Sequence, residues 1–220
     1  MNFFKKLLSV SILVFAGIIF LPQETFSQSF AVKINGGSLG AGGEIAVKLN
    51  NSFNARAGGN FLNVDYLYET GADDEFDVDA SLGLQNAAAL IDWHPFKGSF
   101  RLSAGMIYNK NRITTDLLPK KNYQIGGDVI TSDELGALQA ELTFRPVSPM
   151  VSMGFGNVFR GSRFGVNVEL GMVYQGSPAV AMQAEGLLAP SAEQADILEK
   201  NLEWFEAYPV FTLSLNYRIN

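Results

Sequence analysis

The alternation that organises this chain is clearest in "GEIAVKLNNSFNARAGG", Gly43–Gly59. Apolar and polar side chains alternate on both sides of the segment Asn50–Ser52. A pattern of period 2 that is interrupted by a short turn predicts two antiparallel strands joined in a hairpin. One face of this hairpin is apolar, and the other carries Glu44, Lys48 and Arg56. The fold therefore depends on whether the apolar face packs on a second sheet or faces lipid.

The first residues predict export. Two lysines precede an apolar run from Leu7 to Leu21, and small side chains at Thr25 and Ser27 suit a cleavage site. This order is typical of a secretory signal peptide cut after Ser27. The alternative is a membrane anchor helix, but a run of about 15 residues is shorter than the roughly 20 needed to span a bilayer. We expect a signal peptide over 1–27 and one domain over 28–220.

The composition narrows the class of protein. The chain has 220 residues and no Cys, so no disulfide framework stabilises it. Removal of Lys5, Lys6 and Glu24 from 16 basic and 22 acidic side chains leaves 14 and 21, a net charge of −7. Nucleic acid, which needs a basic footprint, is therefore not an expected partner. Charged residues make up 17% of the chain, against about 25% in soluble proteins. A transmembrane β-barrel has this profile.

The alternation predicts eight strands. In the fourth it slips near Asn86, which predicts a bulge there. Pro146 and Pro149 interrupt the sixth, where each would remove a ladder donor, so either that strand is broken or one segment is a turn and the count changes. The expected strands lie at 30–35, 39–49, 53–68, 76–93, 100–109, within 138–156, 164–174 and 208–219.

The connections fall into two alternating classes. The short ones are 50–52, 94–99 and 157–163, and the long ones are 69–75, 113–137 and 187–207. An even strand number places both termini beside the short turns, as in outer-membrane barrels with short periplasmic turns and long outer loops. The tight turn at Gly36–Gly37 is an exception, because it falls on the long-loop side.

Two of the long connections contain local structure. Weak alternation within 122–136 predicts a small outer hairpin. In 190–206, Ser191 and Gln194 fit a capping box, and apolar side chains recur at helical spacing, which predicts one short helix. Packing against the rim is the simplest role for this helix. A lid over the mouth or a partner surface are the alternatives.

Lipid is the solvent that explains the apolar faces best. Every backbone N–H and C=O needs a partner in lipid, so a sheet there must close. The pattern predicts an all-β fold, an eight-stranded antiparallel transmembrane β-barrel; a secreted sandwich is the alternative, but its outward faces would be polar. Two aromatic girdles are expected, with Phe53, Trp93, Phe96, Phe100 and Phe164 near the short turns and Tyr66, Tyr68, Tyr108, Tyr174 and Tyr208 near the long loops.

Several motifs carry a family resemblance. They are "LIDWHPF" (Leu90–Phe96), "FRLSAG" (Phe100–Gly105), "GFGN" (Gly154–Asn157), "GMVYQGSP" (Gly171–Pro178) and "AYPVFTLSLNYRI" (Ala207–Ile219). The chain resembles a family of small, largely uncharacterised outer-membrane β-barrel proteins of Gram-negative bacteria. The resemblance implies an eight-stranded barrel and carries over no activity and no catalytic residue. Such proteins commonly end in an aromatic residue that the insertion machinery reads, whereas this chain ends in Asn220.

The inward polar residues predict an ion-paired interior. Side chains fill the interior of a small barrel, and charges of both signs are needed there because an isolated buried charge is costly. The hairpin register places Ala46 opposite Arg56, with Glu44 diagonal to it. A structural network is the favoured interpretation, and a narrow path for ions or solutes is the alternative. The expected lumen polar network comprises Glu44, Lys48, Arg56, Asp79, Arg101, Glu169 and Arg218.

Two other groups of residues are candidates for chemistry. Asp73–Asp79 holds five acidic residues but lacks the Gly and the closing Glu of an EF-hand, so a solvated loop is favoured, with loose divalent bridging to lipopolysaccharide as an alternative. His94 lies near Asp92 and Ser99, as a hydrolase triad requires, but on the short-turn side, which favours an interfacial turn histidine. No catalytic residue, metal site or cofactor is expected.

The sequence thus predicts an integral outer-membrane protein without enzymatic activity, in a structural or surface-interaction role. Its expected partners are outer-membrane lipid, lipopolysaccharide and the barrel insertion machinery, and a monomer is expected. Transport or binding of a small ligand through the lumen is the first alternative. A membrane-embedded lipid-modifying enzyme is the second.

Overall fold

The computed structural model describes residues 29–68, 76–125 and 128–220. The signal peptide expected at 1–27 and the first half of the acidic segment, 73–75, lie outside these ranges. Within the described ranges, no helix has both the length and the apolar character to cross a membrane.

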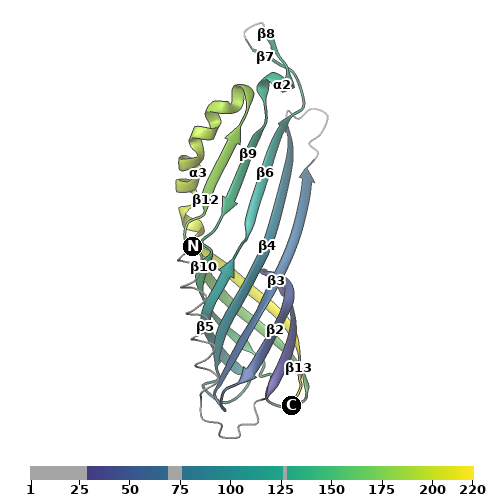
Figure 1. Cartoon of the computed structure of the whole chain (residues 1–220), viewed down its shortest axis with the longest axis vertical. Helices are drawn as coiled ribbons and strands as arrows, with labels where there is room; N and C mark the ends of the chain where they lie inside the picture. The colour runs from purple at the N-terminus through teal and green to yellow at the C-terminus, as the bar shows by residue number, and fades with distance from the viewer. Residues whose placement is uncertain (1–28, 69–75, 126–127) are drawn as a thin grey trace, which may run out of the picture.

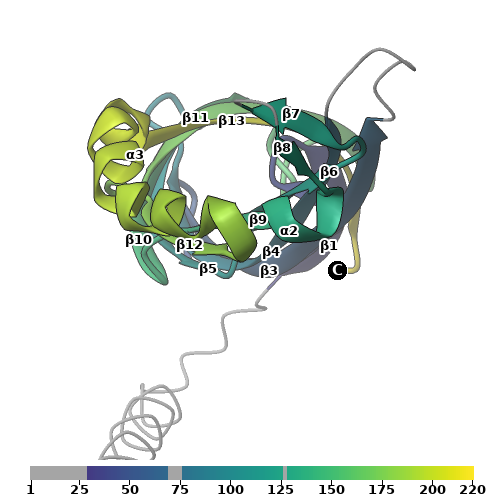
Figure 2. The same cartoon turned by 90° about the horizontal axis from the view of Figure 1, so that it is seen from above.

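Eight antiparallel strands close into a ring (Figures 1 and 2). Their order is β4-β3-β2-β1-β13-β11-β10-β5, and β5 pairs back to β4. A ring of strands closed in this way has no free edge, so this part of the sheet is a β-barrel. The ring strands are β1 (Phe30–Gly37), β2 (Gly40–Lys48), β3 (Phe53–Tyr68), β4 (Phe76–Trp93), β5 (Phe100–Asn109), β10 (Val147–Phe155), β11 (Phe164–Tyr174) and β13 (Ala207–Arg218).

Part of the sheet continues beyond the ring at the end opposite the short turns (Figure 1). There β4 pairs with β6 (Arg112–Pro119) instead of β5, and β9 (Leu138–Thr143) and β12 (Ala179–Ala184) follow in order. We call this part, with the upper halves of β3 and β4, the extension. The long connection expected at 113–137 therefore contains most of β6 as a strand of the main sheet.

Short polar breaks join the ring strands to the extension. Between β5 and β6, the Asn109 side chain accepts from the Asn111 N–H at 2.8 Å, and the Asn111 side chain accepts from the Gln85 N–H at 3.0 Å. Pro146 lies between β9 and β10, and its carbonyl accepts from the Asn109 N–H at 2.7 Å. The sixth strand is thus broken, which was the first of the two alternatives.

The other proline of this region remains within a strand. Pro149 pairs with Met106 of β5, while the ladder between β10 and β11 begins only at Met150↔Val173. A proline beyond the end of a ladder removes no donor from it.

The bulge expected near Asn86 does not form. Residues of β3 and β4 pair without interruption from Phe53↔Trp93 to Tyr68↔Val78. The alternation only seemed to slip because one face of β4 changes character along its length. Leu84 and Asn86 share the regular inward face, whereas the outward face is polar above this point, at Asp79 and Ser81, and apolar below it, at Ala89 and Ile91.

The outer hairpin expected within 122–136 is confirmed as β7 (Tyr123–Ile125) and β8 (Asp128–Ile130). The helix α2 (Ser132–Leu135), which was not expected, follows it. Its capping box is formed by Thr131 and Glu134.

The segment expected to form one helix at 190–206 is divided into three short helical elements. They are the 3-10 helix η1 (Gly186–Gln194), the α-helix α3 (Ala195–Asn201) and the 3-10 helix η2 (Glu203–Glu206). The capping box expected at Ser191 is absent from the start of α3, since α3 begins after Gln194, which makes no side-chain cap hydrogen bond. The Glu199 carboxylate accepts from the Val180 N–H at 3.1 Å, so α3 covers the edge of β12.

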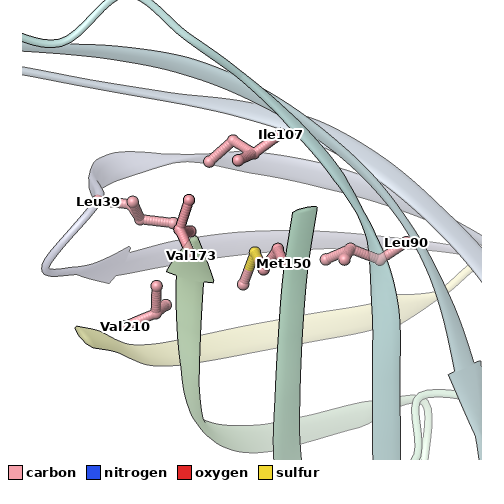
Figure 3. Close-up of a cluster of buried hydrophobic side chains, with 6 residues drawn as sticks. All are labelled: Leu39, Leu90, Ile107, Met150, Val173 and Val210. Carbon is pink, nitrogen blue, oxygen red and sulfur yellow. The ribbon is translucent and has the colours of Figure 1, made fainter. Parts of the chain in front are cut away.

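An apolar cluster fills the ring interior at its long-loop end (Figure 3). Leu39 belongs to it although it was expected to face outward. Leu39 lies in the tight turn after β1, where the strand alternation no longer determines its direction. The cluster comprises Leu39, Leu90, Ile107, Met150, Val173 and Val210.

Candidate functional site

Below the apolar cluster, Glu169 of β11 bridges two arginines from other strands. Its Oε1 accepts from Arg56 Nη2 of β3 at 2.6 Å, and its Oε2 accepts from Arg101 Nη2 of β5 at 2.5 Å. All three side chains are at most 3% exposed. Hydrogen bonds between ionised groups are stronger than neutral ones, so this bridge links distant parts of the ring.

Arg56 is the centre of a wider cluster. Its Nε donates to Asp92 Oδ1 of β4 at 2.9 Å, and its Nη1 donates to Glu44 Oε1 of β2 at 3.0 Å. Lys33 of β1 donates to the other oxygen of Glu44 at 2.5 Å. The lumen cluster thus contains three cations, Lys33, Arg56 and Arg101, and three carboxylates, Glu44, Asp92 and Glu169.

Neutral side chains add hydrogen bonds to two of the carboxylates and to Arg101, whose Nε is buried without a hydrogen-bond partner. Ser103 donates to Asp92 at 2.6 Å, and Ser152 donates to Glu169 at 2.8 Å. Arg101 Nη1 donates to Asn167 Oδ1 at 3.2 Å. Buried ion pairs recover their desolvation cost only when further hydrogen bonds satisfy them. The serine and asparagine contacts supply such bonds in a cluster whose cations and carboxylates are equal in number.

Glycines make room for the large charged side chains. A Cβ on Gly154 of β10 would lie 3.0 Å from Arg101 Cζ and 2.8 Å from the Val168 carbonyl oxygen. A Cβ on Gly58 of β3 would lie 2.6 Å from Glu44 Cγ. The interior glycines therefore help to position the lumen cluster.

Gly154→Ala is expected to lower the free energy of unfolding by about 1–3 kcal/mol, because the backbone and Arg101 must shift to admit a methyl group. Urea unfolding in detergent micelles, followed by circular dichroism, measures the change. Gly36→Ala is the matched control, since a Cβ there meets nothing within 4 Å. Equal stability of the two variants would contradict the close packing.

The structure brings four of the seven expected lumen residues together: Glu44, Arg56, Arg101 and Glu169. The expected register of Ala46 opposite Arg56 is confirmed. Lys48 and Arg218 lie at the short-turn end, where Arg218 donates to the Gly161 carbonyl at 3.1 Å.

Asp79 was expected to face the lumen, but it lies on the outer face of the extension, opposite Asp116. The uninterrupted register of β4 is the reason. Outward side chains in the ring part of β4 have odd numbers, and Asp79 keeps this direction.

Lys33 and Asp92 are members of the cluster that the sequence interpretation missed. Each stands alone as a charge between apolar residues, as in "VKI" at Val32–Ile34 and "IDW" at Ile91–Trp93. That local alternation was the available signal for an inward direction.

His94 does not assemble the hydrolase triad. Its Nδ1 contacts the Phe100 carbonyl at 3.1 Å, and its Nε2 contacts Asn54 Nδ2 at 3.0 Å. Asp92 is instead bonded to Arg56 and Ser103. Burial lowers the pKa of His94, so a neutral ring is favoured, with Nδ1 donating to Phe100 and Nε2 accepting from Asn54.

Among the residues that the structure describes, no three His, Cys, Asp or Glu side chains lie close enough together to hold a metal ion.

The fold and the lumen cluster define a class: an eight-stranded antiparallel β-barrel with an ion-paired interior. The fold is similar to that of Acinetobacter baumannii CarO2, with a TM-score of 0.61, 16% identity, and coverage of 86% of this chain and 98% of that chain. For A. baumannii CarO the TM-score is 0.59, with 16% identity and coverage of 85% and 96%.

A major outer membrane protein from Thermus thermophilus has a TM-score of 0.46 at 14% identity, over 88% of this chain and 100% of that one. No protein-family model matches the sequence, and no curated protein matches it. At 16% identity the two Acinetobacter structures establish the likeness of fold alone.

Proposed function

We propose that this chain is an integral outer-membrane barrel with a closed lumen and a non-catalytic role, either in envelope structure or in surface interaction through its extension. The observation that carries this proposal is a reversal of side-chain polarity along one continuous sheet. The reversal occurs where the ring ends and the extension begins.

Around the ring, the outer face is apolar and the inner face is largely polar. On β11, Val166, Val168, Leu170 and Met172 are exposed on the outer face, while Asn167 and Glu169 are buried on the inner face. A water-soluble sheet has the opposite arrangement. Outward apolar and inward polar alternation is the pattern of a sheet surrounded by lipid.

In the extension the two faces exchange character. The inner face is apolar where Leu82, Ile113, Leu142 and Val180 lie on neighbouring strands. The outer face is largely polar, with Leu67, Leu118, Ala179 and Ala181 as apolar exceptions. Its polar members include Asp65, Asp79, Ser81, Asp116, Gln139 and Glu141. This arrangement suits water, so the reversal supports a membrane boundary between the ring and the extension.

The height of the apolar band supports the same boundary. The strand from Phe164 to Tyr174 advances ten residues of about 3.3 Å each. At a tilt of about 40° to the barrel axis it spans about 25 Å along that axis, which is the height of the apolar band in outer-membrane barrels. Aromatic side chains lie at its lower margin, where the Phe164 and Tyr217 rings are 4.9 Å apart and the Phe100 and Phe155 rings 5.5 Å apart.

The upper aromatic girdle differs from the expected one. Tyr208 points inward and donates to the Ser38 carbonyl at 2.5 Å, and Tyr66 lies in the extension. The side chain of Tyr68 lies outside the described part. Tyr108 and Tyr174 keep the expected exposed positions at this end of the ring.

Folding in the presence and absence of lipid tests the membrane assignment. Mature protein diluted from urea into phosphatidylcholine vesicles should gain the circular dichroism of β-structure, and protein diluted into buffer without lipid or detergent should aggregate. A folded, soluble monomer in buffer alone would contradict the proposal.

No ion conduction is expected from the reconstituted protein. The lumen cluster and the apolar cluster lie one above the other inside the ring, and Arg101, Ile107 and Val173 are almost completely buried. Recordings in planar bilayers under applied voltage should therefore show no channel events. Reproducible unitary currents would favour the first alternative, solute transport through the lumen.

The partners remain proposals of the same kind. Outer-membrane lipid and lipopolysaccharide would solvate the apolar band, the insertion machinery would deliver the chain, and the protein would act as a monomer. The leader over 1–27 would direct export and be cleaved. His94 and Asp92 form hydrogen bonds with other residues of the barrel, so they offer no support for a lipid-modifying enzyme.

A further inference from the structure

A polar pocket of about 230 Å³ lies at the short-turn end. It is lined by the end of β2 and its following turn, by the turn after β4 and by the turn after β10, which contribute Lys48, Lys97 and Arg160. Val158 packs on Ala31 and Ala46, so the third turn also closes the interior from this side. The pocket is therefore separate from the lumen cluster.

The pocket is cationic. Lys48, Lys97 and Arg160 line it together with asparagines, and none of its lining residues is acidic. The nearby carboxylates of Glu44 and Asp92 are already bonded to Lys33, Arg56 and Ser103. Three cations gathered without a carboxylate repel one another, and an anion would relieve this repulsion.

Contacts between turns hold the Arg160 guanidinium and the backbone of Lys97 in place. The Arg160 guanidinium donates to the Lys97 carbonyl, and Asn157 Nδ2 donates to the Gly98 carbonyl at 3.0 Å. Lys97 adopts a φ of 51°, a left-handed conformation that is uncommon for residues other than glycine. The two turns thus form one framework, which positions the Arg160 guanidinium and the backbone that carries Lys97 before any ligand arrives.

We propose that this pocket binds a phosphate ester. The phosphate would accept from Lys48, Lys97 and Arg160, because the oxygens of a tetrahedral phosphate group can accept from several charged donors at once. The apolar side chain of Phe159, which also lines the pocket, would contact the ester's alkyl or glycerol part. In the topology proposed above the pocket faces the periplasm, so the ester could belong to a phospholipid headgroup or to a soluble metabolite.

The test uses the full mature chain in micelles of a non-ionic detergent, so that binding does not depend on membrane insertion. The probes are sn-glycerol 3-phosphate and dihexanoylphosphatidylglycerol, titrated by calorimetry. Lys48→Gln/Lys97→Gln should weaken binding at least about tenfold, because two charge-assisted contacts are lost. Lys110→Gln/Lys121→Gln removes the same charge at the long-loop side and should bind as the unmodified chain does. Circular dichroism verifies that both variants are folded.

The two probes distinguish the sources. Binding of the short-chain lipid alone assigns the site to a headgroup, binding of glycerol 3-phosphate alone assigns it to a soluble ester, and binding of both assigns it to the shared phosphate chemistry. Each of these results supports the proposal if the Lys48→Gln/Lys97→Gln variant binds the same probe more weakly, as stated above. The proposal is overturned if neither probe binds, or if the pocket and control variants bind equally. Such a failure would leave the membrane assignment untouched.

Discussion

Glu169→Gln should lower the free energy of unfolding by about 3–5 kcal/mol, the usual cost of removing one partner from a buried ion pair. Glu169 is the carboxylate that bridges Arg56 and Arg101, and its side chain is 2% exposed. Its loss leaves both guanidiniums short of a counter-charge in a dry interior. Urea titration of the protein in phosphatidylcholine vesicles, followed by tryptophan fluorescence, measures the change.

The matched control is Glu141→Gln, which breaks the pair between Arg112 and Glu141 in the extension, where the side chains are 61% and 35% exposed. A solvent-screened pair contributes about 0–1 kcal/mol. A double variant, Glu169→Gln/Arg101→Gln, should lose less than the sum of its single variants, because the second change removes a cation left without its partner. Similar costs for Glu169→Gln and Glu141→Gln would show that burial adds nothing to the lumen cluster.

Val168→Arg should cost about 2–4 kcal/mol of stability in vesicles, as expected for a cation on the lipid face at the middle of a barrel. Val168 lies near the centre of β11, between Phe164 and Tyr174, and its side chain is 40% exposed on the outer face. The same urea titration in vesicles, together with the yield of folded protein, provides the measurement.

Gln183→Arg serves as the control for Val168→Arg. Gln183 is exposed on the outer face of β12, in the part of the sheet that the polarity reversal places in water. An added arginine there should change stability by less than about 0.5 kcal/mol. If both variants folded into vesicles with equal yield and stability, the ring would not be surrounded by lipid.

The ring could be predicted in detail because each ring strand carries its own alternation. The hairpin of β2 and β3 shows this best: its turn length determined the register of Ala46 against Arg56, and that register placed Glu44 within reach of Arg56. Local pattern was sufficient because a strand has a period of 2 wherever one face differs from the other.

The extension could not be predicted in the same way. Along β4, the alternation seen in the other ring strands would place the apolar side chains of Leu82 and Leu84 on the lipid face. The change of pattern at Asn86 therefore resembles a bulge. The strand is in fact regular, and its surroundings change. The solvent that a face meets is a property of the assembled sheet, so the same alternation has opposite meanings in lipid and in water.

The sequence pattern of residues 30–218 was thus sufficient to predict the number of ring strands, the closure of the sheet and the presence of charges on its inner face. Three-dimensional assembly alone selected the members of the lumen cluster, because Arg56 and Glu169 are 113 positions apart and meet only across a closed ring. The assembled sheet also determined that Asp79 faces outward, and it brought Lys48, Lys97 and Arg160 together around one pocket at the short-turn end. Alternation is local along a strand, whereas the choice of a counter-ion depends on which distant strands the closed ring brings together.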